Sequence, residues 1–173
     1  RRIAYITGDP AHPDAIDRLQ GYRNALAEAG IAFNPELVVP GLFHEESGLV
    51  AAERLLDSRQ RFSAIFAAND QMALGACLGL HRRGLRVPQD VAVVGYDDMS
   101  LATYCDPPLT SVHQPVADAA VQLTDALLAM LDGQSVAPRN VHDARHVCWQ
   151  AEDVYGKNDL GAGCDRGLEQ AGV

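Results

Sequence analysis

Short apolar runs alternate along the chain with segments in which apolar residues recur every three or four positions. The apolar runs predict strands at residues 2–7, 36–39, 64–68, 91–95 and 110–112. The helical spacing predicts helices at residues 16–26, 45–59, 70–83 and 115–131, and Gly30, Gly84 and Gly133 follow three of them, where a helix commonly ends. Strands alternating with helices form a parallel sheet covered on both sides. We therefore expect an α/β fold, an open parallel sheet with helices on both faces.

Polar residues follow the predicted strands at the point where each strand ends. They are Gly8-Asp9, Gly41 to His44, Asn69-Asp70, Tyr96-Asp97-Asp98 and His113-Gln114. Ligands of open parallel sheets bind at the carboxyl ends of the strands, so these residues are candidates for one common rim. Asn, Asp and Gly also gather there as turn formers and caps, and Asn69-Asp70 could serve only to cap the next helix. The adjacent carboxylates Asp97 and Asp98 favour a ligand role more strongly.

The composition excludes several classes of protein. The 173 residues are 47% hydrophobic and 21% charged, which is typical of one globular domain. The formal net charge of −9 argues against nucleic-acid binding by this surface, because phosphate contacts require a basic face. No apolar run approaches the ~20 residues of a membrane-spanning helix, so we expect no membrane partner. The four cysteines form no CxxC pair, which favours reduced thiols in the cytoplasm.

The sequence carries no signature of a catalytic or metal site. It has neither a G-x-S-x-G nucleophile motif nor a GxxxxGK[ST] phosphate loop. His142 and His146, with Cys148 nearby, imitate a zinc-binding HExxH motif, but Asp143 replaces the glutamate and no third ligand stands out. We interpret this spacing as a coincidence. The expectation is a protein that is not an enzyme and has no metal or cofactor.

Four ordered sequence blocks resemble a known family. They are Arg2 to Gly8 with Arg18 to Tyr22, Ala67 to Ala76 (AANDQMALGA), Gly84 to Asp98 (GLRVPQDVAVVGYDD), and Pro107 to Pro115 (PPLTSVHQP). Together they resemble the lactose-repressor (LacI/GalR) family of bacterial transcription regulators, over residues 1 to about 137.

The resemblance implies a position within a larger protein. Family members carry an N-terminal helix-turn-helix and a two-lobed, periplasmic-binding-protein-like effector domain. Residues 1–114 would be the C-terminal lobe, and residues 115–137 would be a crossover helix belonging to the N-terminal lobe. Operator DNA would be bound only by a module outside this sequence. The family also implies a small sugar-like effector and a homodimer, for which Met72–Arg83 and Ser100–Tyr104 are candidate interfaces.

The resemblance also assigns roles at the rim. Asp97 would accept hydrogen bonds from ligand hydroxyls, Asn69 would bridge others, and Arg18 would donate from the first helix. Gln114 would lie at the crossover between the lobes, Phe43 would place its ring against the ligand, and Tyr96 is a weaker candidate. Arg18 could instead pair with an aspartate on its own helix, and Phe43 could be a core residue.

The end of the sequence departs from the family pattern. After Gln134 the family returns to the C-terminal lobe with a strand, for which residues 138–173 give no alternating pattern. We expect residues 138–173 to be an aberrant, disordered tail, and hypothesise that a frameshift in the gene replaced the native ending. The chain also begins without methionine, so we expect a fragment of a longer protein.

Two alternatives remain open on the sequence alone. A periplasmic sugar-binding protein of an ABC transporter shares the two-lobed fold, although the Ala67 to Ala76 block favours the regulator. The chain could also be a small α/β enzyme that uses Asp97 and Asp98 with His113.

Overall fold

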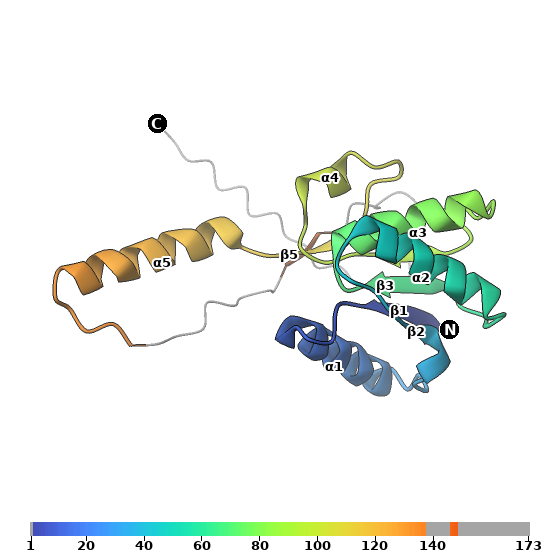
Figure 1. Cartoon of the computed structure of the whole chain (residues 1–173), viewed down its shortest axis with the longest axis horizontal. Coiled ribbons are helices and arrows are strands. Elements are labelled where there is room, and N and C mark those ends of the chain that lie inside the picture. Colours follow the sequence, from blue (N-terminus) through green and yellow to red (C-terminus); the bar gives the residue numbers. More distant parts are fainter. Residues whose placement is uncertain (1, 138–145, 149–173) are drawn as a thin grey trace.

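The computed structural model describes residues 2–137 and 146–148. Strands and helices alternate along most of this part of the chain (Figure 1). The strands are β1 (Ile3–Thr7), β2 (Val38–Pro40), β3 (Ala64–Ala67), β4 (Ala92–Val94), β5 (Ser111–His113) and β6 (His146–Cys148). The helices are α1 (Pro13–Glu28), the 3-10 helix η1 (Pro35–Leu37), α2 (Glu45–Asp57), α3 (Asp70–Arg82), α4 (Ser100–Thr103) and α5 (Val116–Leu131).

Four strands form a parallel sheet in the order β2-β1-β3-β4. β5 runs alongside the end of β4, joined by parallel bridges from Val94 to Thr110 and from Asp97 to His113. In Figure 1, α1 lies on one side of the sheet, and α2 and α3 lie on the other. The predicted α/β fold, an open parallel sheet with helices on both faces, is therefore confirmed.

The core forms because successive side chains of β1 point to opposite faces of the sheet. Tyr5 stacks on Tyr22 of α1 with ring centroids 4.8 Å apart, so it faces α1. Ile6 points to the opposite face, where α2 and α3 contribute the buried residues Leu55 and Met72. These side chains belong to one cluster of buried hydrophobic residues that spans the sheet.

α2 and α3 pack unusually closely because glycines lie at their contact. A Cβ atom on Gly48 would collide with the backbone of Met72, and one on Gly75 would collide with the carbonyl of Glu45. The two helices therefore approach backbone to backbone. This contact fixes the N-terminus of α3 beside the end of β2, at the edge of the sheet where the polar rim was predicted.

The structure contains three elements that the sequence patterns did not predict. Residues 35–37 form a 3-10 turn before β2, because the Asn34 side chain accepts a hydrogen bond from the amide of Glu36. The short helix α4 was not predicted. The prediction of no strand after residue 138 is wrong for residues 146–148, where β6 pairs antiparallel with β5. The remaining predictions on the tail, including the zinc-like spacing from His142, lie outside the described residues.

α5 differs from the other long helices in having no buried residue. It extends away from the sheet in Figure 1, and seven of its large hydrophobic side chains are exposed. They are Val116, Val121, Leu123, Leu127, Leu128, Met130 and Leu131. Despite its apolar character, neither α5 nor any other helix in the described part of the chain is long and apolar enough to span a membrane.

Candidate functional site

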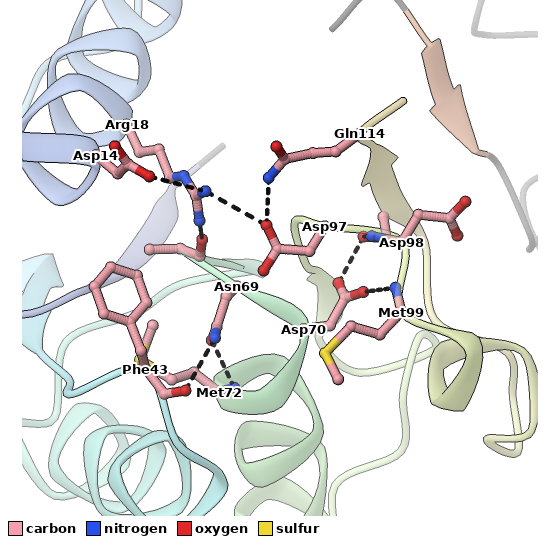
Figure 2. A network of polar contacts seen from close by, with 12 residues as sticks. Asp14, Arg18, Phe43, Asn69, Asp70, Met72, Asp97, Asp98, Met99 and Gln114 are labelled. Carbon is pink, nitrogen blue, oxygen red and sulfur yellow. Dashed lines mark hydrogen bonds and ion pairs between the residues drawn. The ribbon is translucent and has the colours of Figure 1, made fainter. Parts of the chain in front are cut away.

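Asp97 is the centre of a polar cluster at the carboxyl edge of the sheet (Figure 2). Its Oδ1 atom accepts a hydrogen bond of 2.6 Å from the Gln114 amide and one of 3.4 Å from Arg18 Nη2. Gln114 follows β5, Arg18 belongs to α1 and Asp97 follows β4. Three segments far apart in sequence thus converge on one carboxylate oxygen. The strand ends predicted this position for Asp97 and Gln114, and the family resemblance predicted it for Arg18.

Arg18 is held by four separate contacts. Its Nη1 atom donates to the carbonyl of Ala68, and its guanidinium lies 4.0 Å from the centre of the Tyr96 ring. The same side chain forms ion pairs with Asp97 at 3.4 Å and with Asp14, one turn earlier on α1, at 3.9 Å. The intrahelical pairing considered from the sequence is therefore present beside the pairing across the rim. A guanidinium fixed on several sides presents its remaining N–H groups in a defined direction.

Asn69 caps α3, and the capping prediction is confirmed. Its Oδ1 atom accepts a hydrogen bond of 3.0 Å from the amide of Met72, while its Nδ2 atom donates to the carbonyl of Phe43. The residue is only 5% exposed. Its side chain therefore ties the loop after β2 to the start of α3, and one amide N–H and one lone pair of Oδ1 have no partner among the described residues.

Phe43 adopts a left-handed backbone conformation, with φ of 64°. This conformation is uncommon outside glycine and indicates a position constrained by its surroundings. The ring occupies the space where a side chain on Gly8 would lie, and it makes a T-shaped contact with the His12 ring, with the centroids 5.8 Å apart. Phe43 is half-buried and packs partly on the core, so it has both the core contact and the rim position considered from the sequence.

Asp98 points away from Asp97 in Figure 2, although the two residues are adjacent. Both residues have positive φ, 109° for Asp97 and 52° for Asp98. These two successive backbone conformations direct the side chains apart. Asp98 Oδ2 lies 2.8 Å from His113 Nδ1 on β5. The two carboxylates therefore point in different directions, Asp97 toward Arg18 and Gln114 and Asp98 toward His113.

Asp70 anchors the loop of residues 96–99, which carries Asp97. The sequence patterns predicted Asp70 only as a capping candidate. Asp70 is fully buried, and its carboxylate accepts hydrogen bonds from the Ser111 hydroxyl at 2.5 Å and from the Met99 amide at 2.7 Å. The Asp70 amide donates to the carbonyl of Tyr96. Asp70 therefore fixes both ends of the segment that contains Asp97. The sequence signal for this role is the Asn-Asp pair itself, in which only one residue is needed as the cap.

The electrostatic environment of the two central carboxylates is similar. Burial raises the pKa of Asp97, and the Arg18 charge and the Gln114 hydrogen bond partly offset this effect. Burial also raises the pKa of Asp70, with further increases from Asp97 and Asp98, against the hydrogen bonds from Ser111 and Met99. No group of three or more His, Cys, Asp and Glu suited to a metal ion occurs within the described residues.

Comparisons with known proteins identify the family. The model of the periplasmic binding protein-like domain matches residues 1–149. The HTH-type transcriptional regulator AscG of Escherichia coli (strain K12) is 43% identical over 138 residues, which cover 80% of this chain and 41% of that protein. The structure of a transcriptional regulator CelR–cellobiose complex has a TM-score of 0.75 and 43% identity, covering 80% of this chain and 42% of that chain.

A third comparison gives the same result at lower identity. The structure of a dimeric Lac repressor with a C-terminal deletion has a TM-score of 0.73 and 34% identity, covering 78% of this chain and 49% of that chain. The chain thus spans about half the length of the regulators that it matches. The family match extends to residue 149, beyond the predicted limit of about 137. The chain belongs to the periplasmic binding protein-like domain family and, within it, has the form of this domain found in LacI/GalR transcription regulators.

Proposed function

We propose that this chain is the ligand-sensing C-terminal lobe of a bacterial transcription regulator. A small sugar-like effector would bind at the rim around Asp97 and modulate the binding of operator DNA by a helix-turn-helix outside this chain. The observation that carries the proposal is the convergence of Arg18 and Gln114 on Asp97, next to two aromatic rings. Its membership of a family that includes sugar-complexed regulators supports the same assignment.

The geometry suits a ligand with several hydroxyl groups. Both described donors to Asp97 use Oδ1, so Oδ2 remains as an acceptor among the described residues. Asn69 retains one donor and one acceptor, and Arg18 retains its Nε–H. Planar groups of this kind bind neighbouring hydroxyls in pairs, and an aromatic face such as that of Phe43 covers the C–H side of a sugar ring.

The link to DNA would be a coupling free energy between two sites. Effector binding would change the arrangement of two lobes and thereby the operator affinity, typically by ~1–3 kcal/mol. The net charge of −9 supports a DNA-binding module separate from this lobe. α5 would belong to the other lobe, which would cover its exposed apolar side chains.

A homodimer would form through α3 and α4. Leu78 on α3 is 46% exposed, and Leu101 and Tyr104 at α4 are 50% and 83% exposed. Large apolar side chains that cluster on a surface are typical of protein contacts. The similarity to a dimeric Lac repressor supports a dimer. We place the protein in the cytoplasm, where operator DNA is located, and propose no catalytic activity.

The test is a titration of the 173-residue chain with cellobiose, glucose and ribose, followed by backbone amide NMR shifts. We expect saturable shifts at residues 96–98 for at least one of these sugars. The dissociation constant should be larger than about 1 mM, because this lobe supplies only part of a two-lobed cleft. The variant Asp97→Asn should weaken binding about tenfold or more, since it loses a charged acceptor. Asp90→Asn, which removes an equal charge on an exposed loop, should leave binding unchanged.

The absence of saturable shifts near Asp97 for every sugar would count against the proposed function. The transporter alternative is not favoured, because the relatives compared above are transcription regulators. Sugar turnover by the purified chain, measured by the appearance of new sugar signals in the same NMR samples, would support the enzyme alternative instead.

A further inference from the structure

We propose that the rim around Asp97 accepts uncharged polyhydroxyl ligands and rejects anionic ones such as sugar phosphates. This inference rests on the proposed function, since it names the class of effector that the same site takes. It follows from the balance of charges at the rim and from the groups that the protein has already used.

The charges at the rim are predominantly negative. Arg18 is the only cation among the residues labelled in Figure 2. The carboxylates labelled there are Asp14, Asp70, Asp97 and Asp98. Histidines also lie close by: His113 is paired with Asp98, and the His12 ring makes a T-shaped contact with Phe43. An anionic group near Asp97 would therefore meet a field that repels it.

The one cation is already occupied by the protein. Arg18 donates from Nη1 to the Ala68 carbonyl, and its Nη2 atom lies 3.4 Å from Asp97 and 3.9 Å from Asp14. Its side chain is only 15% exposed. A phosphate that formed paired hydrogen bonds with Nη1 and Nη2 would displace Asp97 and the Ala68 carbonyl from these atoms. That displacement would leave a half-buried carboxylate without its partner.

The helix N-termini near the rim carry acidic residues, and those of α2 and α3 are also capped by side chains. A helix N-terminus is a common anion site because its amides are unpaired and its dipole is positive there. In α3, Asn69 accepts the Met72 amide and Asp70 lies in the first turn. In α1, the first turn carries Asp14. In α2, His44 Nδ1 accepts the Ser47 amide, and Glu45 and Glu46 occupy the first turn. Each terminus thus already has an acidic residue in its first turn.

The groups that remain at the rim include two acceptors, which require donors from the ligand. Asp97 Oδ2 can only accept a hydrogen bond, and so can the free lone pair of Asn69 Oδ1. Sugar hydroxyls donate, whereas a phosphate dianion only accepts. A neutral sugar therefore satisfies these acceptors, and a phosphate both leaves them unpaired and adds a like charge.

The test compares matched neutral and phosphorylated sugars on the 173-residue chain at low salt and pH 7. The pairs are glucose with glucose 6-phosphate and ribose with ribose 5-phosphate, and inorganic phosphate is a separate probe. The readout is the saturation of amide shifts at residues 96–98. We expect the phosphorylated member of a pair to bind about tenfold more weakly or worse than its neutral partner. Inorganic phosphate should cause no saturable shift at these amides.

Two variants make the electrostatic cause testable. Asp14→Asn removes a negative charge beside Arg18 and should strengthen binding of the phosphorylated sugar several-fold relative to the neutral one. Asp57→Asn makes the same change of net charge at the end of α2, where Asp57 pairs with Arg83. It should leave the ratio of phosphorylated-sugar to neutral-sugar affinity unchanged for both sugar pairs. If Asp14→Asn alters the ratio no more than Asp57→Asn does, the electrostatic explanation is wrong.

The two proposals fail in different ways. Equal or tighter binding of a phosphorylated sugar, or saturable binding of inorganic phosphate at residues 96–98, would overturn the selectivity while leaving ligand sensing intact. If no neutral sugar binds, the proposed function is contradicted. In that case the phosphate titration alone decides whether the rim rejects anions.

Discussion

The hydroxyl of Ser111 on β5 donates a 2.5 Å hydrogen bond to the buried carboxylate of Asp70 at the start of α3, 41 residues earlier in the chain. The same hydroxyl accepts the amide of Asp98 at 3.0 Å, and Asp70 also accepts the amide of Met99. The segment that carries Asp97 is therefore fastened on both sides of its left-handed turn. Asp70 positions the proposed ligand-binding carboxylate without lying at the rim itself.

Replacement of Asp70 by asparagine should destabilise the fold and weaken sugar binding together. The amide nitrogen of asparagine cannot accept a hydrogen bond, so either Ser111 or Met99 loses its acceptor. The expected loss in the free energy of unfolding is about 1–3 kcal/mol, measured by urea denaturation. Leu55→Ala, which removes a buried side chain away from the rim, should lower stability by about 2–5 kcal/mol without changing the affinity of the folded chain. An equal affinity loss in both variants would contradict the positioning role.

The contribution of Asp70 to stability should decrease as the pH rises. Burial raises the pKa of Asp70 in the folded chain above the ordinary value of about 3.9. Between those two values the folded state binds more protons than the unfolded state, so stability falls with increasing pH in that window. The difference in free energy of unfolding between the wild type and Asp70→Asn should thus be larger near pH 4 than near pH 7.

Asp90 provides a control, because its contribution to stability should change with pH in the opposite direction. Hydrogen bonds from Arg86 lower the pKa of Asp90 to about 2. The stabilisation from Asp90 is therefore complete above about pH 3.9 and is lost as the pH falls through about 2. Asp90→Asn should give a difference from the wild type that shrinks on acidification. The same sign of pH dependence in both variants would contradict the assigned environments.

Replacement of Gly8 by alanine should displace the Phe43 ring. The new methyl group would occupy space now filled by that ring, and Phe43 has little freedom because its backbone is already left-handed. Sugar affinity should fall several-fold, with altered aromatic shifts for Phe43 in NMR spectra. Gly21→Ala, on α1 with nothing near the added atom, should instead stabilise the chain by about 0.5–1 kcal/mol. Unchanged Phe43 shifts in Gly8→Ala would show that the ring is not confined as described.

Lysine should not replace Arg18. A single ammonium cannot contact the Ala68 carbonyl and Asp97 through a planar fork while stacking on Tyr96. We expect sugar affinity to fall about tenfold or more in a calorimetric titration, although the charge is unchanged. Arg83→Lys alters an exposed pair with Asp57 and should leave affinity and stability within experimental error. Normal affinity in Arg18→Lys would mean that charge alone is sufficient.

The contact between α2 and α3 should not tolerate a side chain at Gly75. A methyl group there would meet backbone atoms of Glu45 and Leu49, which cannot move without separating the helices. Gly75→Ala should cost about 1–3 kcal/mol in urea denaturation. Gly79→Ala, one turn later, meets its nearest neighbours at 3.2 to 3.3 Å and should be close to neutral. Equal costs at both positions would contradict a backbone-to-backbone contact at Gly75.

Sequence patterns predicted the sheet and its long helices because apolar spacing depends mainly on local burial. They failed where a tertiary contact decides the structure. β6 has no alternating pattern and forms by pairing with β5. The short α4 begins next to Met99, whose amide is bonded to a buried carboxylate from another element. The sequence gives no local sign of such a partner.

The site was predicted in outline for the same reason. The carboxyl ends of parallel strands must share one edge, so Asp97 and Gln114 could be brought together in advance, whereas Arg18 was placed there by the resemblance to the LacI/GalR family. The separate directions of Asp97 and Asp98 could not, because two successive positive φ values at non-glycine residues oppose ordinary backbone preference. The supporting role of Asp70 depends on a hydroxyl 41 positions away, and the Asn69-Asp70 pair does not indicate that partner.

The exposed apolar side chains of α5 should promote self-association of the chain in solution. Its exposed leucines and valines lie outside the cooperative core, so self-association through them needs no unfolding. On heating, light scattering should therefore rise before the far-ultraviolet circular dichroism of the sheet and its covering helices is lost. The concentration at which the chain stays in solution is then governed by one helix and is independent of the stability of the fold that carries the ligand rim.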